Sequence, residues 1–249
     1  MSERLKGKVA FISGGARGLG ASHARRLVRE GAVVIIGDIL EEEGRALVSE
    51  LGTDSALFVR LDVTSEASWQ TAAEAGEARF GPISILVNNA GIQKLGTVLT
   101  SSLEEFDDVV KVNLNGTFLG TKVIAPSLIK AGGGSIINVS SIAGMLGLPN
   151  TVGYVAAKWA VRGLTKASAL ELGEYHIRVN SIHPGRIVTD LTKGLDSPIR
   201  PNQLIKEPGV PEDISNLVAF LASDESRFST GSEFIVDGGR YVGENISVG

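Results

Sequence analysis

Short apolar runs alternate along the chain with longer amphipathic stretches. The short runs are rich in β-branched residues and are apolar throughout, as strands are when both faces of a sheet are covered. We therefore expect the buried strands of a mainly parallel sheet. The predicted strands cover residues 9–13, 33–37, 56–61, 83–88, 135–140, 179–183 and 233–236.

The amphipathic stretches are predicted to be helices covering residues 18–30, 41–51, 65–79, 102–130, 152–173 and 211–222. Ser65 and Ser102 precede acidic first turns, and Pro211 suits the first turn of a helix. Strands that alternate with helices predict an α/β fold with a seven-stranded, mainly parallel, doubly wound sheet and helices on both faces. No linker or repeat divides the chain, so residues 1–249 are expected to form a single domain.

One stretch, residues 193–211, departs from this pattern because it holds four prolines and has little periodicity. A long irregular segment inside a compact domain is commonly a functional loop. We expect a substrate flap at about residues 191–210.

A glycine-rich turn with Gly14, Gly18 and Gly20 follows the first predicted strand. Glycines there let backbone N–H groups approach a pyrophosphate at the positive end of the next helix. The spacing, three residues and then one between glycines, differs from the usual dinucleotide fingerprint of one and then two. The turn indicates a dinucleotide site, and the alternative is a turn that needs glycine only for positive φ angles.

Asp38 lies just after the second predicted strand, where a dinucleotide fold places the acid that binds the adenosine ribose. A carboxylate at this position accepts hydrogen bonds from ribose hydroxyls and repels a 2′-phosphate, so NAD is favoured over NADP. Ile39 offers no cation for that phosphate, although Arg17 in the glycine turn could supply one. The alternative reading of Asp38 is a surface acid that caps the next helix.

Tyr154 and Lys158 are four residues apart on a predicted helix and therefore share one face. An adjacent ammonium stabilises a phenolate and lowers the pKa of a tyrosine, which suits proton exchange near neutral pH. Ser141 follows the fifth predicted strand, at the sheet edge where open α/β folds bind ligands. Each feature has a plain alternative, a solvated helix face for the pair and a turn hydroxyl for Ser141.

Taken together, these elements resemble the classical short-chain dehydrogenases/reductases over essentially the whole chain. The shared elements are the turn at 14–20, Leu61-Asp62-Val63, Asn88-Asn89-Ala90-Gly91, Asn113, Ser141, Tyr154 with Lys158, and Pro184-Gly185 followed by Thr189. Within the family, the stretches 14–20, 158–164 and 177–181 are most similar to bacterial NAD-dependent 3α/20β-hydroxysteroid dehydrogenases. The resemblance implies a single-domain Rossmann fold and an oxidoreductase.

The resemblance also implies roles for the polar residues. Tyr154 would be the general acid in reduction and the general base in oxidation, and Ser141 would orient the substrate oxygen. Lys158 would lower the pKa of Tyr154 and bind the nicotinamide ribose, and Asn113 would hold a water that relays protons. The alternative for Asn113 is a helix-bending residue bonded to nearby backbone.

For the cofactor, the resemblance implies that Asp62 binds the adenine amino group and that Ile187 and Thr189 hold the carboxamide. The alternative for Asp62 is a cap at the end of a strand, and for residues 88–91 a turn stabilised by its own side chains. The full set of implied NAD-binding residues is Gly14, Arg17, Gly18, Leu19, Gly20, Asp38, Asp62, Val63, Asn89, Ala90, Gly91, Tyr154, Lys158, Pro184, Gly185, Ile187 and Thr189.

Substrate choice is expected to depend on residues 92–95, 142–150 and the flap, where Leu146, Leu148 and Ile199 would suit an apolar ring. Arg186 is unexpected beside the carboxamide anchor. Its guanidinium is expected to turn toward solvent, and the alternative is recognition of an anionic or polar substrate group. His183, beside Pro184, is expected to be a packed residue at the end of a strand.

Composition narrows the possibilities further. The net charge is -4 and no basic cluster is present, so nucleic acid is not expected as a partner. The chain has no cysteine and its three histidines lack metal-ligand spacing, so no metal site is expected. Neither a signal peptide nor a membrane span is visible, and we expect a cytoplasmic protein.

The predicted function is NAD-dependent hydride transfer between nicotinamide and a small-molecule secondary alcohol or ketone, with a hydroxysteroid or similar bulky cyclic compound as substrate. Alternatives are a general secondary-alcohol dehydrogenase or ketoreductase and a 3-oxoacyl-thioester reductase. A non-catalytic nucleotide-binding module is the alternative from a different class. The resemblance implies a homotetramer built through the helices that follow the fourth and fifth strands.

Overall fold

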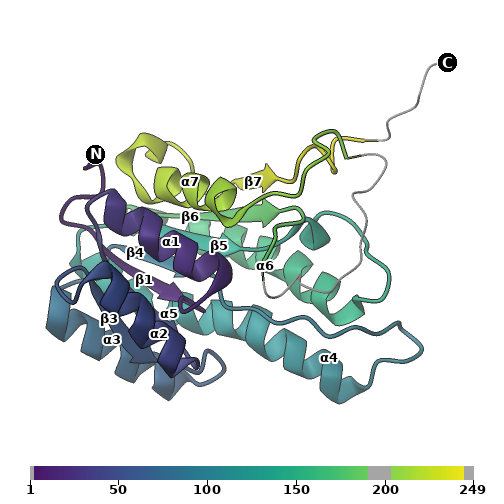
Figure 1. Cartoon of the computed structure of the whole chain (residues 1–249), viewed down its shortest axis with the longest axis horizontal. Coiled ribbons are helices and arrows are strands. Elements are labelled where there is room, and N and C mark those ends of the chain that lie inside the picture. The colour runs from purple at the N-terminus through teal and green to yellow at the C-terminus, as the bar shows by residue number, and fades with distance from the viewer. Residues whose placement is uncertain (1–2, 190–202, 244–249) are drawn as a thin grey trace.

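The apolar runs form one seven-stranded sheet in the computed structural model, which describes residues 3–189 and 203–243 (Figure 1). The spatial order is β3-β2-β1-β4-β5-β6-β7, and every pair of neighbours is parallel. The α/β doubly wound fold predicted from the sequence is confirmed. The strands are β1 (Val9–Ser13), β2 (Val33–Asp38), β3 (Ala56–Arg60), β4 (Ile85–Asn88), β5 (Gly134–Val139), β6 (Ile177–Pro184) and β7 (Glu233–Val236).

Helices connect successive strands and cover both faces of the sheet. They are α1 (Gly18–Arg29), α2 (Glu41–Leu51), α3 (Glu66–Phe80), α4 (Leu103–Val110), α5 (Gly116–Lys130), α6 (Val152–Leu172) and α7 (Pro211–Ala222). Short helical turns are η2 (Ile142–Gly144), η3 (Gly173–Tyr175) and η4 (Asp224–Ser226). The expected starts are confirmed at α3, where the Ser65 hydroxyl accepts from the Ser68 N–H, and at α4, where Ser102 and Glu105 form a capping box.

The single helix predicted over residues 102–130 is wrong in one respect. A π-helical turn, η1 (Lys111–Asn115), separates α4 from α5. The Nδ2 of Asn113 in this turn donates to the carbonyl oxygens of Val109 and Ile92, at 2.9 and 2.8 Å. The contact with Ile92 ties the turn to the loop after β4, and such bulges are frequent at functional sites.

Side chains alternate across the sheet and build two cores. In β1, Ala10 and Ile12 pack toward α1, α2 and α7, whereas Phe11 packs toward α3, α5 and α6. The centroid of the Phe11 ring lies 5.3 Å from that of the fully buried Trp69. Burial on both faces explains why the strands read as continuous apolar runs.

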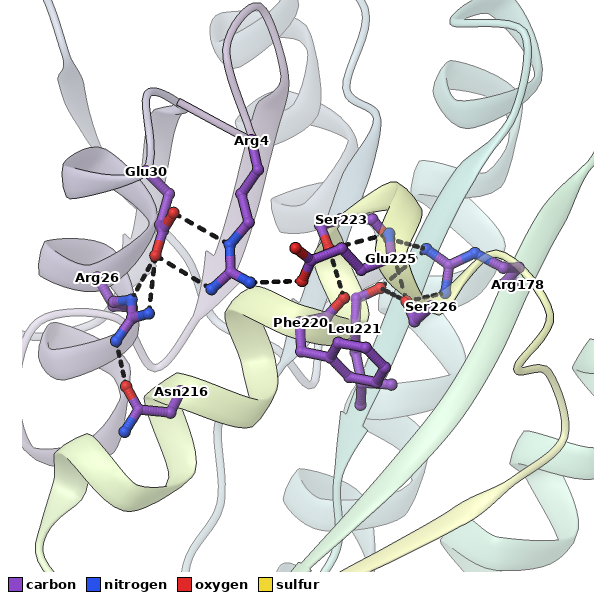
Figure 2. Close-up of polar contacts among 10 residues, drawn as sticks. All are labelled: Arg4, Arg26, Glu30, Arg178, Asn216, Phe220, Leu221, Ser223, Glu225 and Ser226. Carbon is purple, nitrogen blue, oxygen red and sulfur yellow. Dashed lines mark hydrogen bonds and ion pairs between the residues drawn. The ribbon is translucent and has the colours of Figure 1, made fainter. Parts of the chain in front are cut away.

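Helices α1 and α7 lie side by side on the same face of the sheet (Figure 1). Figure 2 shows the polar network at their ends, in which the buried Glu30 carboxylate pairs with Arg4 at 3.0 Å and Arg26 at 2.7 Å. Arg4 also pairs with Glu225, and Arg26 donates to Asn216 of α7. The hydrogen bond with Glu30 is the largest cause that raises the pKa of Arg4. The network joins the N-terminal segment to the last helix.

The order of the strands reverses direction between β1 and β4, which opens a crevice at their carboxyl ends. Most of the flap predicted at 191–210 falls on residues 190–202, which lie outside the described residues. Its final part is anchored, since the N–H groups of Leu204 and Ile205 donate to the Gly238 carbonyl at 3.1 and 2.9 Å.

Candidate active site

The glycine turn after β1 is shaped by close backbone packing. Gly14 and Gly18 have φ angles of +61° and +56°. A Cβ on Gly14 would lie 2.7 Å from the Cα of Ala90, and one on Gly20 would collide with the carbonyl oxygen of Gly14. The Nδ2 of Asn89 donates to that same oxygen at 2.9 Å. Glycine is therefore required here for both conformation and space, and the turn is locked to the end of β4.

Asp38 connects the end of β2 to this turn. Its two carboxylate oxygens accept from the Ala16 N–H at 3.0 Å and from the Leu40 N–H at 3.1 Å. Leu40 precedes α2, so the capping role considered from the sequence is present. The carboxylate also lines a cleft, and the exposed Arg17 lines the same cleft.

This cleft has a volume of about 300 Å³ and collects most of the predicted cofactor residues. Predicted and present in its lining are Gly14, Arg17, Gly18, Leu19, Asp38, Asp62, Val63, Asn89, Ala90, Gly91 and Thr189. Gly20, also predicted, packs beneath the turn and does not line the cleft. The sequence analysis did not assign a cofactor role to Ile39, Leu40, Leu61, Ile92 or Val112, which also line it. Their position in the sequence could have indicated this, because four of the five lie just after the carboxyl ends of strands.

Asp62 ends a strand in a turn and also lines the cleft. Its Oδ1 accepts from the N–H and the hydroxyl of Thr64 at 2.9 and 2.7 Å, as a residue that ends a strand in a turn does. It also lines the cleft beside Val63. The turn fixes its carboxylate at the cleft wall.

A second cavity of about 100 Å³ continues from the cleft. Both are lined by Leu19, Asn89, Gly91 and Thr189, so one channel runs from Asp38 to the helix α6. The other lining residues of the second cavity are Asn113, Val139, Ser140, Ser141, Tyr154, Lys158, Pro184, Gly185 and Ile187. The structure thus brings together the four predicted catalytic residues from η1, β5 and α6. Arg186, Leu146 and Leu148 line neither cavity in the described part of the chain, and Ile199 lies outside it.

Tyr154, Ser141 and Lys158 form the centre of this cavity. Tyr154 and Ser141 line the cavity together, close enough that Ser141 lowers the pKa of Tyr154, and the Nζ of Lys158 lies 5.5 Å from the centroid of the Tyr154 ring. The same Nζ donates to the Val139 carbonyl at 2.8 Å, and the Ser140 hydroxyl donates to the Lys158 carbonyl at 3.0 Å. Helix α6 is therefore attached to the end of β5 at the position that carries the phenol and the ammonium.

The ionisation of these groups differs from the expectation. Burial raises the pKa of Tyr154, and the hydrogen bond from Ser141 offsets part of that rise. Burial also lowers the pKa of Lys158 to about 8. The lowered tyrosine pKa expected from the spacing is not found, because desolvation disfavours both charged forms.

Asn113 faces the same cavity. Its Nδ2 is engaged by backbone carbonyls, whereas its buried Oδ1 has no hydrogen-bond partner among the described residues. A Cβ on Gly91 would lie 2.6 Å from that Oδ1 and 3.6 Å from the Nζ of Lys158. An unsatisfied acceptor therefore lies near the ammonium, across the space that glycine leaves open.

The end of β6 and the residues after it form the wall of the second cavity opposite α6. The Gly185 N–H donates to the Val236 carbonyl at 2.8 Å, and a Cβ on Gly185 would lie 2.6 Å from the Cα of Asp237. Ile187 is buried and pairs with Gly209, and Thr189 faces Gly18 of the glycine turn. A narrow channel with a glycine cradle at one end and paired polar side chains at the other fits an extended dinucleotide.

Comparison with known proteins agrees with this geometry. The sequence profile of a family described as enoyl-(acyl carrier protein) reductase matches residues 14–240. A 3-alpha-(or 20-beta)-hydroxysteroid dehydrogenase of Mycobacterium tuberculosis (strain ATCC 25618 / H37Rv) is 52% identical over 98% of this chain and 93% of its own length. The chain belongs to the short-chain dehydrogenase/reductase family. It is an oxidoreductase of that family.

Other short-chain dehydrogenases/reductases are similar over nearly their whole length. A trans-4-hydroxycyclohexanecarboxylate dehydrogenase of Sinomonas cyclohexanicum is 49% identical over 99% of this chain and 97% of its own. The crystal structure of a 3-ketoacyl-(acyl-carrier-protein) reductase from Brucella melitensis complexed with NADH has a TM-score of 0.91 and 36% identity. That match covers 95% of this chain and 99% of the other. No helix within residues 3–189 or 203–243 has the length and apolar character needed to cross a bilayer.

Proposed function

We propose that this short-chain dehydrogenase/reductase uses NAD to interconvert the secondary hydroxyl of a cyclic compound and the corresponding ketone. The observation that carries the proposal is that Tyr154, Ser141 and Lys158 line one cavity together, at one end of a channel whose other end holds Asp38. A hydroxyl bound between Tyr154 and Ser141 would have its carbon toward the channel.

NAD is favoured by the chemistry of the cleft. Asp38 presents a carboxylate where a 2′-phosphate would lie, and two backbone N–H groups hold that side chain in place. The Brucella melitensis relative was crystallised with NADH. The residues proposed to hold NAD are Gly14, Arg17, Gly18, Leu19, Asp38, Asp62, Val63, Asn89, Ala90, Gly91, Tyr154, Lys158, Pro184, Gly185, Ile187 and Thr189. The bound nicotinamide would accept or supply the hydride.

Side chains of this chain would donate and accept the proton that accompanies hydride transfer. The raised pKa of Tyr154 keeps its phenol protonated at neutral pH, ready to donate to a carbonyl oxygen. Ser141 fixes that oxygen, and its hydroxyl stabilises the charge that develops on it. In the reverse direction Tyr154 loses its proton, and the Lys158 ammonium, still largely charged at pH 7, stabilises the phenolate. The unpartnered Oδ1 of Asn113 offers an acceptor for a water that exchanges protons with Lys158.

Three relatives support a ring alcohol as the substrate. Their names refer to a hydroxysteroid, to trans-4-hydroxycyclohexanecarboxylate and, in a Comamonas testosteroni enzyme that is 42% identical over 95% of this chain and 98% of its own length, to cyclopentanol. A 3α-hydroxysteroid, trans-4-hydroxycyclohexanecarboxylate and cyclopentanol each carry a hydroxyl on a saturated ring. Ile92 and Val139 contribute apolar walls to the channel, and contact with such walls suits a ring.

The test is turnover of a panel of ring alcohols with NAD. Cyclopentanol, trans-4-hydroxycyclohexanecarboxylate and a 3α-hydroxysteroid are each assayed for NADH formation, with wild type and with Tyr154→Phe. We expect activity on at least one ring alcohol and a loss of at least about 100-fold in kcat for Tyr154→Phe. Tyr175→Phe, on the exposed η3 turn, is the matched control and should retain activity. Full activity of Tyr154→Phe, or no activity on any ring alcohol, would contradict the proposal.

The cofactor has its own test. Asp38→Ala removes the carboxylate, and we expect kcat/KM with NADP to rise at least about tenfold relative to that with NAD. Glu42→Ala, an acid in the first turn of α2, serves as control. A wild-type preference for NADPH would instead support a 3-oxoacyl-thioester reductase.

We also propose a cytoplasmic homotetramer with one domain per chain. Apolar side chains are exposed on α4, α5 and α6, among them Leu103, Phe118 and Trp159, which are 74%, 48% and 46% exposed. Burying such residues against a second copy would remove apolar surface from water. Light scattering should give about four times the 26.1 kDa of one chain, and a monomer would exclude this arrangement.

A further inference from the structure

His183 of β6 is fully buried, as predicted, and both of its ring nitrogens are hydrogen-bonded. Nδ1 lies 3.1 Å from the main-chain oxygen of Ser141, and Nε2 lies 2.9 Å from the hydroxyl of Ser181. A carbonyl oxygen only accepts, so Nδ1 carries the hydrogen and Nε2 accepts from Ser181. Burial lowers the pKa of His183, with the bond to Ser141 acting in the opposite direction, and the ring stays neutral.

The hydrogen bond from the His183 ring to the Ser141 carbonyl lies where the backbone pairing between β5 and β6 stops. The last residue pair is Val139 with Ile182, followed by the bond from the Ser140 N–H to the Ile182 carbonyl at 2.8 Å. Pro184 has no N–H and cannot extend the ladder. The next connection between the two segments is made by the side chain of His183.

The contact bears directly on the active site because it holds the main chain of a residue whose side chain meets Tyr154. Ser141 opens the η2 turn, in which its carbonyl also accepts from the Gly144 N–H at 2.8 Å and its hydroxyl accepts from the Ala143 N–H at 3.1 Å. Rotation of the Ser141 peptide would move that hydroxyl away from Tyr154. A shift of this kind lowers rate more than it lowers affinity.

We propose that His183 is a positioning residue, whose neutral ring, oriented by Ser181, sets the Ser141 backbone so that its hydroxyl bonds Tyr154. The inference rests on the proposed function, because Ser141 and Tyr154 matter only if they act on the substrate. It assigns no proton transfer to His183 itself. It acts only through Ser141.

Two amide substitutions separate the two ring contacts. The amide nitrogen of Asn can reach the position of Nδ1, so His183→Asn keeps the donor to Ser141 and loses the contact with Ser181. The amide of Gln reaches the position of Nε2, so His183→Gln keeps the contact with Ser181 and loses the donor to Ser141. We expect His183→Gln to lower kcat about 10- to 100-fold with KM for NAD changed less than about threefold, and His183→Asn, which loses only the support of Ser181, to lower kcat several-fold at most.

The pH profile provides a readout that a general loss of stability would not move. Ser141 lowers the pKa of Tyr154, so a displaced Ser141 raises it. In the oxidation direction the profile of His183→Gln should therefore shift to higher pH. His23→Gln is the matched control, because His23 is an equally buried histidine bonded to Ser215 between α1 and α7. It should lower stability without shifting the profile.

A double-mutant cycle tests whether the effect passes through Ser141. In a Ser141→Ala background, His183→Gln should cause no further loss of kcat. Equal losses for the Asn and Gln variants, an additive double variant, or an unshifted profile would each overturn the inference. If His183→Gln does not fold, Ser181→Ala, which removes only the support of the ring, should lower kcat several-fold, and unchanged kcat would overturn the inference. Failure of the proposed function would appear separately, as unchanged turnover in Tyr154→Phe.

Discussion

The ammonium of Lys158 donates to the main-chain oxygen of Val139 at 2.8 Å, and no carboxylate pairs with it in the described part of the chain. Its side chain is buried beneath α6, and burial alone accounts for the fall of its pKa to about 8. The folded protein therefore holds a cation that water would solvate better. Such a buried cation lowers the free energy of unfolding, although the proposed reaction needs it to stabilise the Tyr154 phenolate.

Lys158→Met tests this conflict. We expect kcat to fall at least about 100-fold, while the free energy of unfolding of the protein without NAD rises by about 1 to 3 kcal/mol at pH 7. The pKa of Lys158 in the folded state, about 8, is below the 10.5 of the unfolded chain, so the unfolded state binds more protons between these values. Wild-type stability should therefore gain from this group as pH rises from 8 to 10.5.

Urea unfolding at pH 7 and pH 10 measures both effects. The difference in stability between Lys158→Met and wild type should shrink at the higher pH. Lys122→Met, which removes an exposed lysine of α5, is the control and should show no such trend. A variant less stable than wild type at pH 7 would refute the idea.

Ser141→Ala should change the pH dependence of oxidation. The Ser141 hydrogen bond lowers the pKa of Tyr154, so its removal raises that pKa. Tyr154 must be deprotonated to act as a base, and the rising limb of kcat/KM against pH should move to higher pH. Ser140→Ala, whose hydroxyl donates to the Lys158 carbonyl, is the comparison and should leave the limb in place. An unmoved limb in Ser141→Ala would separate Ser141 from the proton transfer.

Gly14→Ala and Gly163→Ala should have opposite effects on stability. Gly14 has a φ of +61° and its added methyl would press on Ala90, so we expect a loss of more than about 2 kcal/mol and of NAD binding. Gly163 lies exposed in the interior of α6 with open space around it. Alanine there should add about 0.5 to 1 kcal/mol. Thermal unfolding and NAD titration distinguish the two, and a stable Gly14→Ala that binds NAD would argue against the cradle.

His23 should make the fold sensitive to acid. Burial lowers its pKa from 6.5 to about 3, and its Nε2 has no partner among the described residues. In the unfolded chain His23 therefore binds a proton below pH 6.5, whereas in the folded chain it binds one only below about pH 3. Stability from this group is complete above 6.5 and is lost as pH falls toward 3, by about 2 kcal/mol at pH 5.

Chemical denaturation at pH 7.5 and pH 5 measures this loss. His23→Gln should lack this part of the decline, and His176→Asn should behave as wild type because His176 is exposed and asparagine tolerates its φ of +60°. Equal declines in wild type and His23→Gln would show that other groups control acid sensitivity.

Much of the fold was predictable because the local pattern and the tertiary structure agree. The central strands are buried on both faces, so strand positions followed from the apolar runs along the chain, with errors confined to the ends, as in β6, which begins at Ile177 rather than 179. The π-helical turn at Lys111–Asn115 was not predictable. It depends on a bond from Asn113 to Ile92, a residue distant in sequence.

The site shows the same division. The glycine turn and the spacing of Tyr154 and Lys158 are local features, and the sequence placed both correctly at the channel. The ionisation of Tyr154 depends on desolvation by segments that only the fold brings together, so it could not be predicted from local spacing. The contact of His183 with Ser141 was equally hidden, because it joins the ends of two strands that are neighbours only in the sheet.

Strand β7 is the last strand among residues 3–189 and 203–243, yet Val236 holds Gly185 at the wall of the catalytic cavity. During synthesis from the N-terminus, the earlier strands can assemble while this wall is still missing. A nascent chain that ends before residue 233 therefore lacks a finished pocket however well its glycine turn has formed. Enzymatic competence arrives only once residues 233–236 have been made, so premature termination yields no partially active product.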